Sequence, residues 1–391
     1  MVTRSKKSVI RHVWSSAALS SLLLASDLVM AGPRDVANQI FNRLNGVPPS
    51  AAKLDELEKL VADGKLRDAA MAAINDPSGM FYNITLRNIA AQWSNPDKTS
   101  RVPLNDFIAT VVGMTRDDVP FNQVLSGDIL YTVNAQGAPA YSLANNQHYE
   151  FAERGSVDLS KALTKQTQSA LPRALPADVT AGVLTTRGFA ESYYKAGTNR
   201  RALAFTLDNF LCRPLETLQD TTRPDYRIRR DVTRAPGGDT SLFRNKCAGC
   251  HTGMDPMAGA FAYLDFDDTS TSLTYTPNQV RPKFNRNASE FPDGYVTVDD
   301  SWINFWTEGQ NVNVGWSGDS SGNGVRSLGT MLTSTEAFSS CMAKKAVEAL
   351  CLRPVVNQDD VAAVAKISAN FKASNFSLKS VYADAAVHCS K

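Results

Sequence analysis

Two cysteines and a histidine lie close enough in the sequence to act on one redox or metal centre. Cys247, Cys250 and His251 form the pattern C-x-x-C-H, which is the attachment signal for a c-type haem. In such a site the two thiols add across the haem vinyl groups as thioethers, and the adjacent histidine supplies the proximal iron ligand. The pattern occurs once, so we predict one covalently bound haem (heme c) with His251 as an iron ligand.

Two other chemistries use a C-x-x-C pair. A zinc site usually needs a second pair of ligands at similar spacing, and the sequence contains no second C-x-x-C. A thioredoxin-like redox pair expects a βαβ context, which the surrounding hydrophobic pattern does not indicate. Haem attachment is therefore the favoured interpretation of the motif.

The sixth position of the iron could be filled by a histidine or a methionine. His148 lies in the polar stretch Asn145–Tyr149 and is the best histidine candidate for a distal ligand or distal acid/base. An ordinary loop histidine is an equally good interpretation. Met331 lies at a separation that suits a distal methionine, although a core position is the simpler interpretation. Met254 and Met257 follow the motif so closely that we expect them on the proximal side.

Cationic side chains upstream of the motif could bind the two haem propionates. Arg227 and Arg230 are the candidates for a bidentate clamp, with Arg229 and Arg234 beside them in the sequence. The alternative interpretation of this basic stretch is a solvated turn without a ligand.

The N-terminus has the features of a secretory signal peptide. Basic residues within positions 4–11 precede an apolar run over 13–25, and Val29-Met30-Ala31 forms a cleavage site of the small-x-small type. We therefore expect cleavage after Ala31 and export to the periplasm or the cell exterior. The apolar run is short for a membrane span, and no later stretch is apolar enough for one.

Export bears on the four cysteines outside the motif, because an oxidising compartment favours disulfides. Cys341 and Cys351 are ten residues apart on one predicted helix. That spacing corresponds to about 15 Å along a helix, which is too far for a direct bridge. Each is therefore expected to pair with Cys212 or Cys389.

The hydrophobic pattern predicts a mainly α fold, with a multi-helical body, a cytochrome c-like haem domain and long ordered loops. The predicted domains are a signal peptide (1–31), an N-terminal helical domain (32–140), a mixed helix and loop region (141–240), the haem domain (241–325) and a C-terminal helical domain (326–391). Helices are predicted near 36–44, 50–60, 66–74, 81–93, 105–112, 121–130, 202–211, 326–352, 358–372 and 377–388.

Several motifs resemble the cytochrome-like domains of large secreted proteins of the planctomycete type. The haem motif is followed by Asp255-Pro256 and an apolar, aromatic stretch to Asp265-Phe266-Asp267, similar to the C-x-x-C-H, D-P and F-D elements of those domains. Phe338-x-x-Cys341 and the helix to Arg353 look like the helical domain that follows there. The resemblance is best over 180–391, and implies secretion, a covalent haem and flanking helices. Asp255-Pro256 is expected to shape the turn after the haem-bearing helix.

These features predict an exported mono-haem cytochrome that transfers electrons with a redox partner protein. One haem motif without a second redox centre supports this function. One alternative is a haem enzyme of the peroxidase or oxidase type with an open distal site and His148 as acid/base. Another is a cell-surface binding or assembly module with a structural haem. The 41 basic and 39 acidic side chains do not indicate a nucleic-acid partner.

Overall fold

The computed structural model describes residues 31–172, 175–195 and 197–390, so the predicted signal peptide lies outside the described residues except for Ala31. Helices α1 to α15 dominate this part of the chain, and the strands form three two-stranded antiparallel sheets. The prediction of a mainly α, multi-helical fold is confirmed. Within the described residues, no helix has the length and apolar character needed to cross a membrane.

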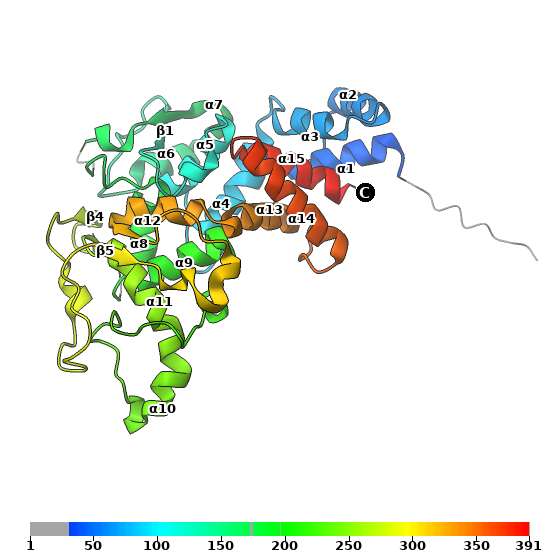
Figure 1. Ribbon diagram of the computed structural model, residues 1–391. Coiled ribbons are helices and arrows are strands. Elements are labelled where there is room, and N and C mark those ends of the chain that lie inside the picture. Colours follow the sequence, from blue (N-terminus) through cyan, green and yellow to red (C-terminus); the bar gives the residue numbers. More distant parts are fainter. Residues whose placement is uncertain (1–30, 173–174, 196, 391) are drawn as a thin grey trace, which may run out of the picture.

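The first and last helices of the chain pack together at one end of the molecule. Figure 1 shows the blue N-terminal helices beside the red C-terminal ones, and α15 packs on both α13 and α3. Ser50 caps α2 through the backbone N–H of Lys53, and Asn357 caps α14 through that of Asp360. The six helices are α1 (Pro33–Asn45), α2 (Ala51–Ala62), α3 (Leu66–Ile74), α13 (Glu336–Cys351), α14 (Gln358–Ala373) and α15 (Leu378–Cys389).

A second group of elements packs around helix α5 (Asp106–Arg116), which is buried from Asp106 to Thr115 and is capped by Asn105. Strand β1 (Leu130–Val133) packs on α5 and pairs with β2 (Leu163–Gln166). The remaining members of this group are α4 (Arg87–Trp93), α6 (Gln147–Arg154), α7 (Leu159–Ala162) and α8 (Arg187–Tyr193). Helix α9 (Arg200–Leu211) packs instead on α11 and α13.

Two sequence predictions in this group are wrong. The helix predicted over 121–130 is only a 3₁₀ turn at Phe121–Gln123, followed by β1. Gly127 interrupts the run there. Its carbonyl accepts from the backbone N–H of Gly182, and the carbonyl of Val124 accepts from that of Val183, instead of continuing a helix. The polar stretch around His148 is not a loop, because α6 begins at Gln147. Its apolar periodicity is too short to stand out from the sequence.

The haem motif lies at the base of an arm that projects from the body. Helix α10 (Thr240–Leu242) forms the lower tip of the molecule in Figure 1, and a π-helical turn over Phe243–Cys247 leads into α11 (Ala248–Ala258). Helix α11 packs on α9 and on β5 (Ser301–Ile303), which pairs with β6 (Ser321–Asn323). The hairpin of β3 (Leu264–Asp267) and β4 (Ser272–Tyr275) and helix α12 (Gly324–Thr333) complete the fold.

The expected turn at Asp255-Pro256 is also wrong, because α11 continues through both residues to Ala258. Pro256 lacks a backbone donor and disfavours the helix locally. Buried hydrogen bonds from Arg200 and Arg229 to Asp255 hold this part of the helix in place. Tertiary contacts therefore override the local preference of the sequence.

One continuous hydrophobic core extends from Ala37 in α1 to Ala386 in α15. A small second cluster, which we call the arm cluster, contains Ile228, Val232, Phe243 and Ala248, with Cys247 packed against it. The arm cluster thus joins the segment before the arm to the first residues of the haem motif.

Two disulfides fasten helices of the main core to one another. Cys212 at the end of α9 is bonded to Cys341 in α13, and Cys351 at the end of α13 is bonded to Cys389 in α15. The prediction that Cys341 and Cys351 each pair with one of the other two cysteines is confirmed.

Candidate haem site

The two thiols of the motif lie on the first turn of α11 and on the residue before it. Cys247 and Cys250 are half-buried and unpaired, whereas the other four cysteines form the two disulfides. The thiol of Cys250 donates to the carbonyl of Leu215 over 3.7 Å, and burial raises its pKa. The pairing pattern thus separates the two motif cysteines from the four structural ones.

The imidazole of His251 is oriented by a carboxylate one helical turn away. Its Nδ1 lies 3.1 Å from Oδ1 of Asp255, and its side chain is 20% exposed. Asp255 is ionised, so Nδ1 carries the proton and acts as the donor. Its Nε2 has no hydrogen-bond partner among the described side chains and backbone groups. The ring therefore presents the nitrogen that a proximal iron ligand would use.

Asp255 is the centre of a buried charge network. Arg200 at the start of α9 donates to both of its oxygens over 2.6 and 2.9 Å, and to both oxygens of Asp231 over 2.7 Å. The backbone N–H of Arg229 donates a further bond of 3.1 Å. Burial alone would raise the pKa of Asp255, but the charge of Arg200 and bonds from His251 and Arg200 hold it well below its usual range.

The arginines predicted to bind propionates have different environments. Arg230 lies in the segment that contributes Ile228 and Val232 to the arm cluster, and its buried Nε has no hydrogen-bond partner within the described chain. Arg227 donates to the Tyr295 hydroxyl and stacks on that ring, 4.5 Å from the centroid. Arg230 is therefore the better candidate for a propionate contact.

Arg229 and Arg234 have structural roles. Arg229 is 1% exposed and donates to the carbonyls of Thr198 and Asp255. Burial lowers its pKa to about 10. Arg234 stacks on Phe291 at 3.9 Å and on Phe243 at 4.8 Å from the ring centroids. The basic stretch before the motif is thus largely built into the fold.

The structure does not bring His148 to the motif. Its Nε2 accepts a 2.8 Å bond from the backbone N–H of Val133, and its Nδ1 lies 2.7 Å from the carbonyl of Pro139. The ring is 6% exposed, and α6 lies beside β1, well apart from α11 in Figure 1. Both ring nitrogens are engaged by the backbone, which leaves neither for iron or for proton transfer.

The methionines near the motif are core residues. Met331 in α12 is 3% exposed, and its Sδ accepts a 3.9 Å contact from the side-chain amide of Asn304. Met254 and Met257 are also buried in the main core. Packing explains all three positions, as the simpler interpretation of Met331 proposed.

Sequence reasoning missed Arg200 and Asp231 and gave Asp255 a different role. Position Asp255 is four residues after His251, which places both side chains on one helix face if the helix continues. The spacing of four residues was the available signal for this pair. Pro256 obscured it, because a proline predicts the end of a helix. No local pattern could indicate Arg200, which lies 55 residues away from Asp255 in the sequence.

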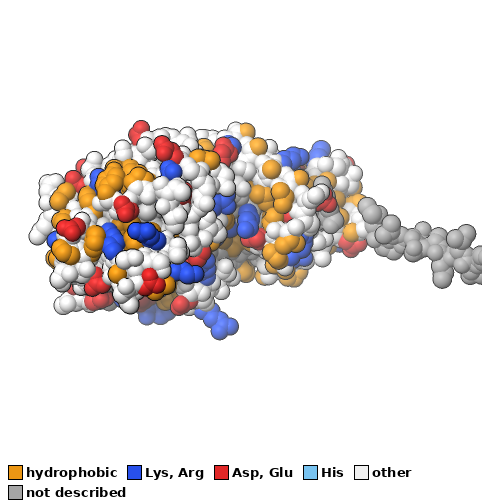
Figure 2. All heavy atoms as spheres, turned by 60° about the horizontal axis from the view of Figure 1, so that its bottom comes forward, with side chains coloured by type: hydrophobic (Ala, Val, Ile, Leu, Met, Phe, Trp, Pro, Cys, Tyr) orange, Lys and Arg blue, Asp and Glu red, His pale blue; other side chains and the backbone are white. Residues whose placement is uncertain are grey.

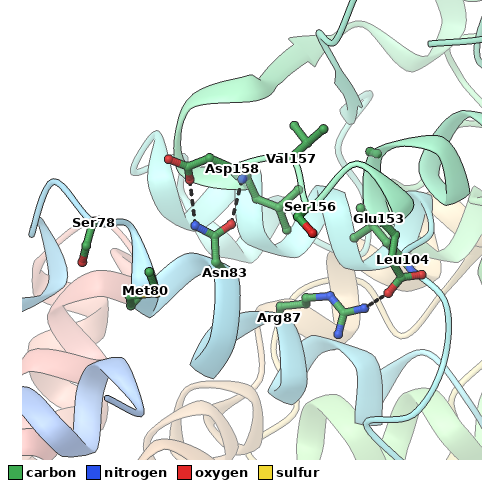
Figure 3. Close-up of a pocket in the computed structure, with 11 residues that line it drawn as sticks. Ser78, Met80, Asn83, Arg87, Leu104, Glu153, Ser156, Val157 and Asp158 are labelled. Carbon is green, nitrogen blue, oxygen red and sulfur yellow. Dashed lines mark hydrogen bonds and ion pairs between the residues drawn. The ribbon is translucent and has the colours of Figure 1, made fainter. Parts of the chain in front are cut away.

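Several clefts elsewhere in the molecule contain charged side chains, and two of them show how these side chains are paired. One has a volume of about 470 Å³ and is crossed by the bonds of Asn83 with Asp158 and of Arg87 with Glu153 (Figure 3). The other, of about 720 Å³, includes His388 and Asp360. These two groups are bonded to each other over 2.7 Å, and Arg353 also binds Asp360. The polar groups of both clefts are thus largely paired.

The face that includes the arm has no single dominant charge. Figure 2 shows basic, acidic and hydrophobic side chains interspersed over it.

Among known proteins, no family model, no curated sequence and no solved structure matches this chain. The assignment of a function therefore depends on the chemistry of the site itself.

Proposed function

We propose that this chain is an exported mono-haem c-type cytochrome that transfers single electrons with a protein partner. The observation that supports this most strongly is the separation of the cysteines. Four are paired in disulfides, and the two that remain flank His251 in a C-x-x-C-H motif. The proposal also agrees with the resemblance of the motif to secreted cytochrome-like domains.

Each residue has a defined part in the proposed site. Cys247 and Cys250 would hold the haem as thioethers, and His251 would bind the iron through Nε2. Arg230, whose Nε has no partner within the described chain, would bind a propionate. The haem would supply a one-electron couple, and the protein would tune that couple through the proximal histidine and its surroundings.

Export is part of the same proposal. Two disulfides in the described chain are typical of proteins that fold in an oxidising compartment. The predicted signal peptide would direct the chain there, to the periplasm or the cell exterior. Covalent attachment suits such a location, since a lost haem is not easily regained outside the cytoplasm.

The test is to produce the protein in a bacterial periplasm together with haem-ligation machinery. We expect one haem per chain in denaturing mass spectrometry and a c-type pyridine haemochrome spectrum. The Cys247→Ala/Cys250→Ala variant should lose the covalent haem. The Cys351→Ala/Cys389→Ala variant, which removes as many thiols, should keep it. A wild-type chain without bound haem would refute the proposal.

The alternative of a haem enzyme predicts different behaviour. An open distal site would give a high-spin iron that binds carbon monoxide and reacts with peroxide, whereas a simple carrier would be low-spin. His148 does not support the enzyme, because the backbone engages both of its ring nitrogens. Peroxide turnover by the purified protein would favour the enzyme over the carrier.

A further inference from the structure

We propose that Asp255 acts as a positioning residue that lowers the reduction potential of the iron bound by His251. The inference rests on the proposed function, since it requires a haem iron on Nε2. It adds to that function a residue, Asp255, and the direction in which this residue shifts the reduction potential. Asp255 would favour the ferric state through the hydrogen bond that it accepts from the imidazole.

The geometry gives His251 a charged acceptor. Histidines that bind metals usually donate their second N–H to a carboxylate, a backbone carbonyl or water. In this chain the acceptor is Oδ1 of Asp255 at 3.1 Å, and the carboxylate is fully buried. A buried carboxylate draws the Nδ1 proton more strongly than a neutral carbonyl, because little water screens its charge.

The surrounding network keeps Asp255 ionised and fixed. Arg200 donates to both of its oxygens, and the N–H of Arg229 donates to Oδ2. Arg200 is in turn held by Asp231. A carboxylate with this many donors strongly favours the charged form. The acceptor of the His251 proton is therefore anionic in both redox states.

The consequence for the iron follows from charge. An imidazole that shares its Nδ1 proton with a carboxylate carries more electron density on Nε2 and is a stronger donor. Ferric iron has one more positive charge than ferrous iron, so a stronger donor stabilises it more. The couple Fe(III) + e⁻ → Fe(II) then lies at a lower potential than with a neutral acceptor.

The test compares Asp255→Asn with Asp231→Asn in the haem-loaded protein by optical redox titration. Both variants remove one negative charge from the same network, but only Asp255 contacts His251. At a fixed ambient potential, Asp255→Asn should raise the ferrous-to-ferric ratio at least tenfold. For a one-electron couple this is a rise of about 59 mV. Asp231→Asn should change the ratio much less.

A second measurement covers the case in which Asp255→Asn does not fold. In the low-spin ferric wild type, electron paramagnetic resonance reports the strength of the axial ligand field on the iron. We expect a stronger axial field than for haems whose proximal histidine donates to a backbone carbonyl. A purely structural role for Asp255 would not strengthen this field.

The outcomes separate the two proposals. If Asp255→Asn binds haem normally and its potential moves no more than that of Asp231→Asn, the role of Asp255 is wrong and the cytochrome proposal stands. A wild-type axial ligand field in the range of histidines bonded to backbone carbonyls would also overturn the role of Asp255. If the wild type itself binds no covalent haem, the cytochrome proposal fails first.

Discussion

The two halves of helix α11 differ in what they contact, although they belong to one continuous element. At its start, Ala248 and the preceding Cys247 belong to or pack on the small arm cluster, and both thiols and the imidazole of the motif are partly exposed. The residues from Thr252 to Ala258 are all buried, and Met254, Met257 and Ala258 lie in the main core. The reactive groups thus lie where a rigid, buried helix reaches the surface.

This difference shows how the fold can hold the motif in a fixed position and still leave its reactive groups accessible. The buried half is fixed by close packing on Trp306 and by ion pairs with Arg200. The exposed half leaves two thiols and one imidazole nitrogen available for chemistry. Substitutions in the buried half should therefore cost much more stability than substitutions in the arm.

The largest effect is expected for Asp255→Ala, which removes the acceptor of the buried charge network. Arg200 would lose one of its two carboxylate partners, and the buried Arg229 would lose a neighbouring negative charge. Breaking a buried ion pair by removing one partner costs about 3–5 kcal/mol. Urea unfolding monitored by circular dichroism measures the loss.

The control is Asp231→Ala, which leaves the pair of Arg200 and Asp255 intact and should cost less. Asp255 has a folded-state pKa below its unfolded value, so its contribution is complete above the unfolded pKa and is lost as the pH falls toward the folded one. The difference in the free energy of unfolding between wild type and Asp255→Ala should therefore narrow in acid. Equal losses of stability in Asp255→Ala and Asp231→Ala would contradict the proposed network.

A smaller effect is expected when a methyl group is added to a glycine in each half of α11. A Cβ at Gly253 would overlap the indole ring of the buried Trp306. Overpacking of this kind costs about 1–3 kcal/mol. At Gly249 the nearest atom to an added Cβ is the Cβ of Gln219 at 3.1 Å. The higher helix propensity of Ala than of Gly offsets about 1 kcal/mol of the packing cost.

The comparison of Gly253→Ala with Gly249→Ala therefore isolates packing, since the chemical change is the same one turn apart. Differential scanning calorimetry should give a lower melting temperature for Gly253→Ala than for Gly249→Ala. The reverse order would mean that the arm end of the helix is the more tightly packed one.

The smallest effect is expected at the tip of the arm. Leu242 in α10 is 43% exposed, and exposed substitutions of this kind stay within about 0.5 kcal/mol. Leu242→Ala should leave the urea midpoint unchanged within error. Phe243→Ala is the matched variant, because the side chain of Phe243 lies in the arm cluster and is only 7% exposed. A large loss in Leu242→Ala would show that the arm is packed against something in solution.

The sequence predicted the helices that have clear amphipathic periodicity and caps. The predicted helix over 66–74 matches α3, and the one over 358–372 matches α14 to within one residue. The single helix predicted over 326–352 is two helices, because Thr335 caps α13 and ends the run of α12 before it. Short elements such as α6 (8 residues) and α8 (7 residues) have too few turns for an apolar periodicity to stand out from the sequence.

For the candidate site, local spacing was informative and long-range partners were not. C-x-x-C-H marked the motif directly, and helix geometry excluded a bond between Cys341 and Cys351. It did not decide which of the two pairs with Cys212 and which with Cys389. The carboxylate that orients His251 lies on its own helix, yet the guanidinium that fixes this carboxylate comes from α9. Contacts between distant segments arise from tertiary packing, which one sequence does not encode in any local pattern.

The disulfide between Cys212 and Cys341 has a consequence for proteolysis. It closes a covalent ring over 129 residues of chain, and the arm and the haem motif both lie inside that ring. A protease that cuts the protruding arm once would therefore produce two polypeptides that stay covalently joined. The piece that carries the C-x-x-C-H motif would then stay attached to the rest of the protein until the disulfide is reduced.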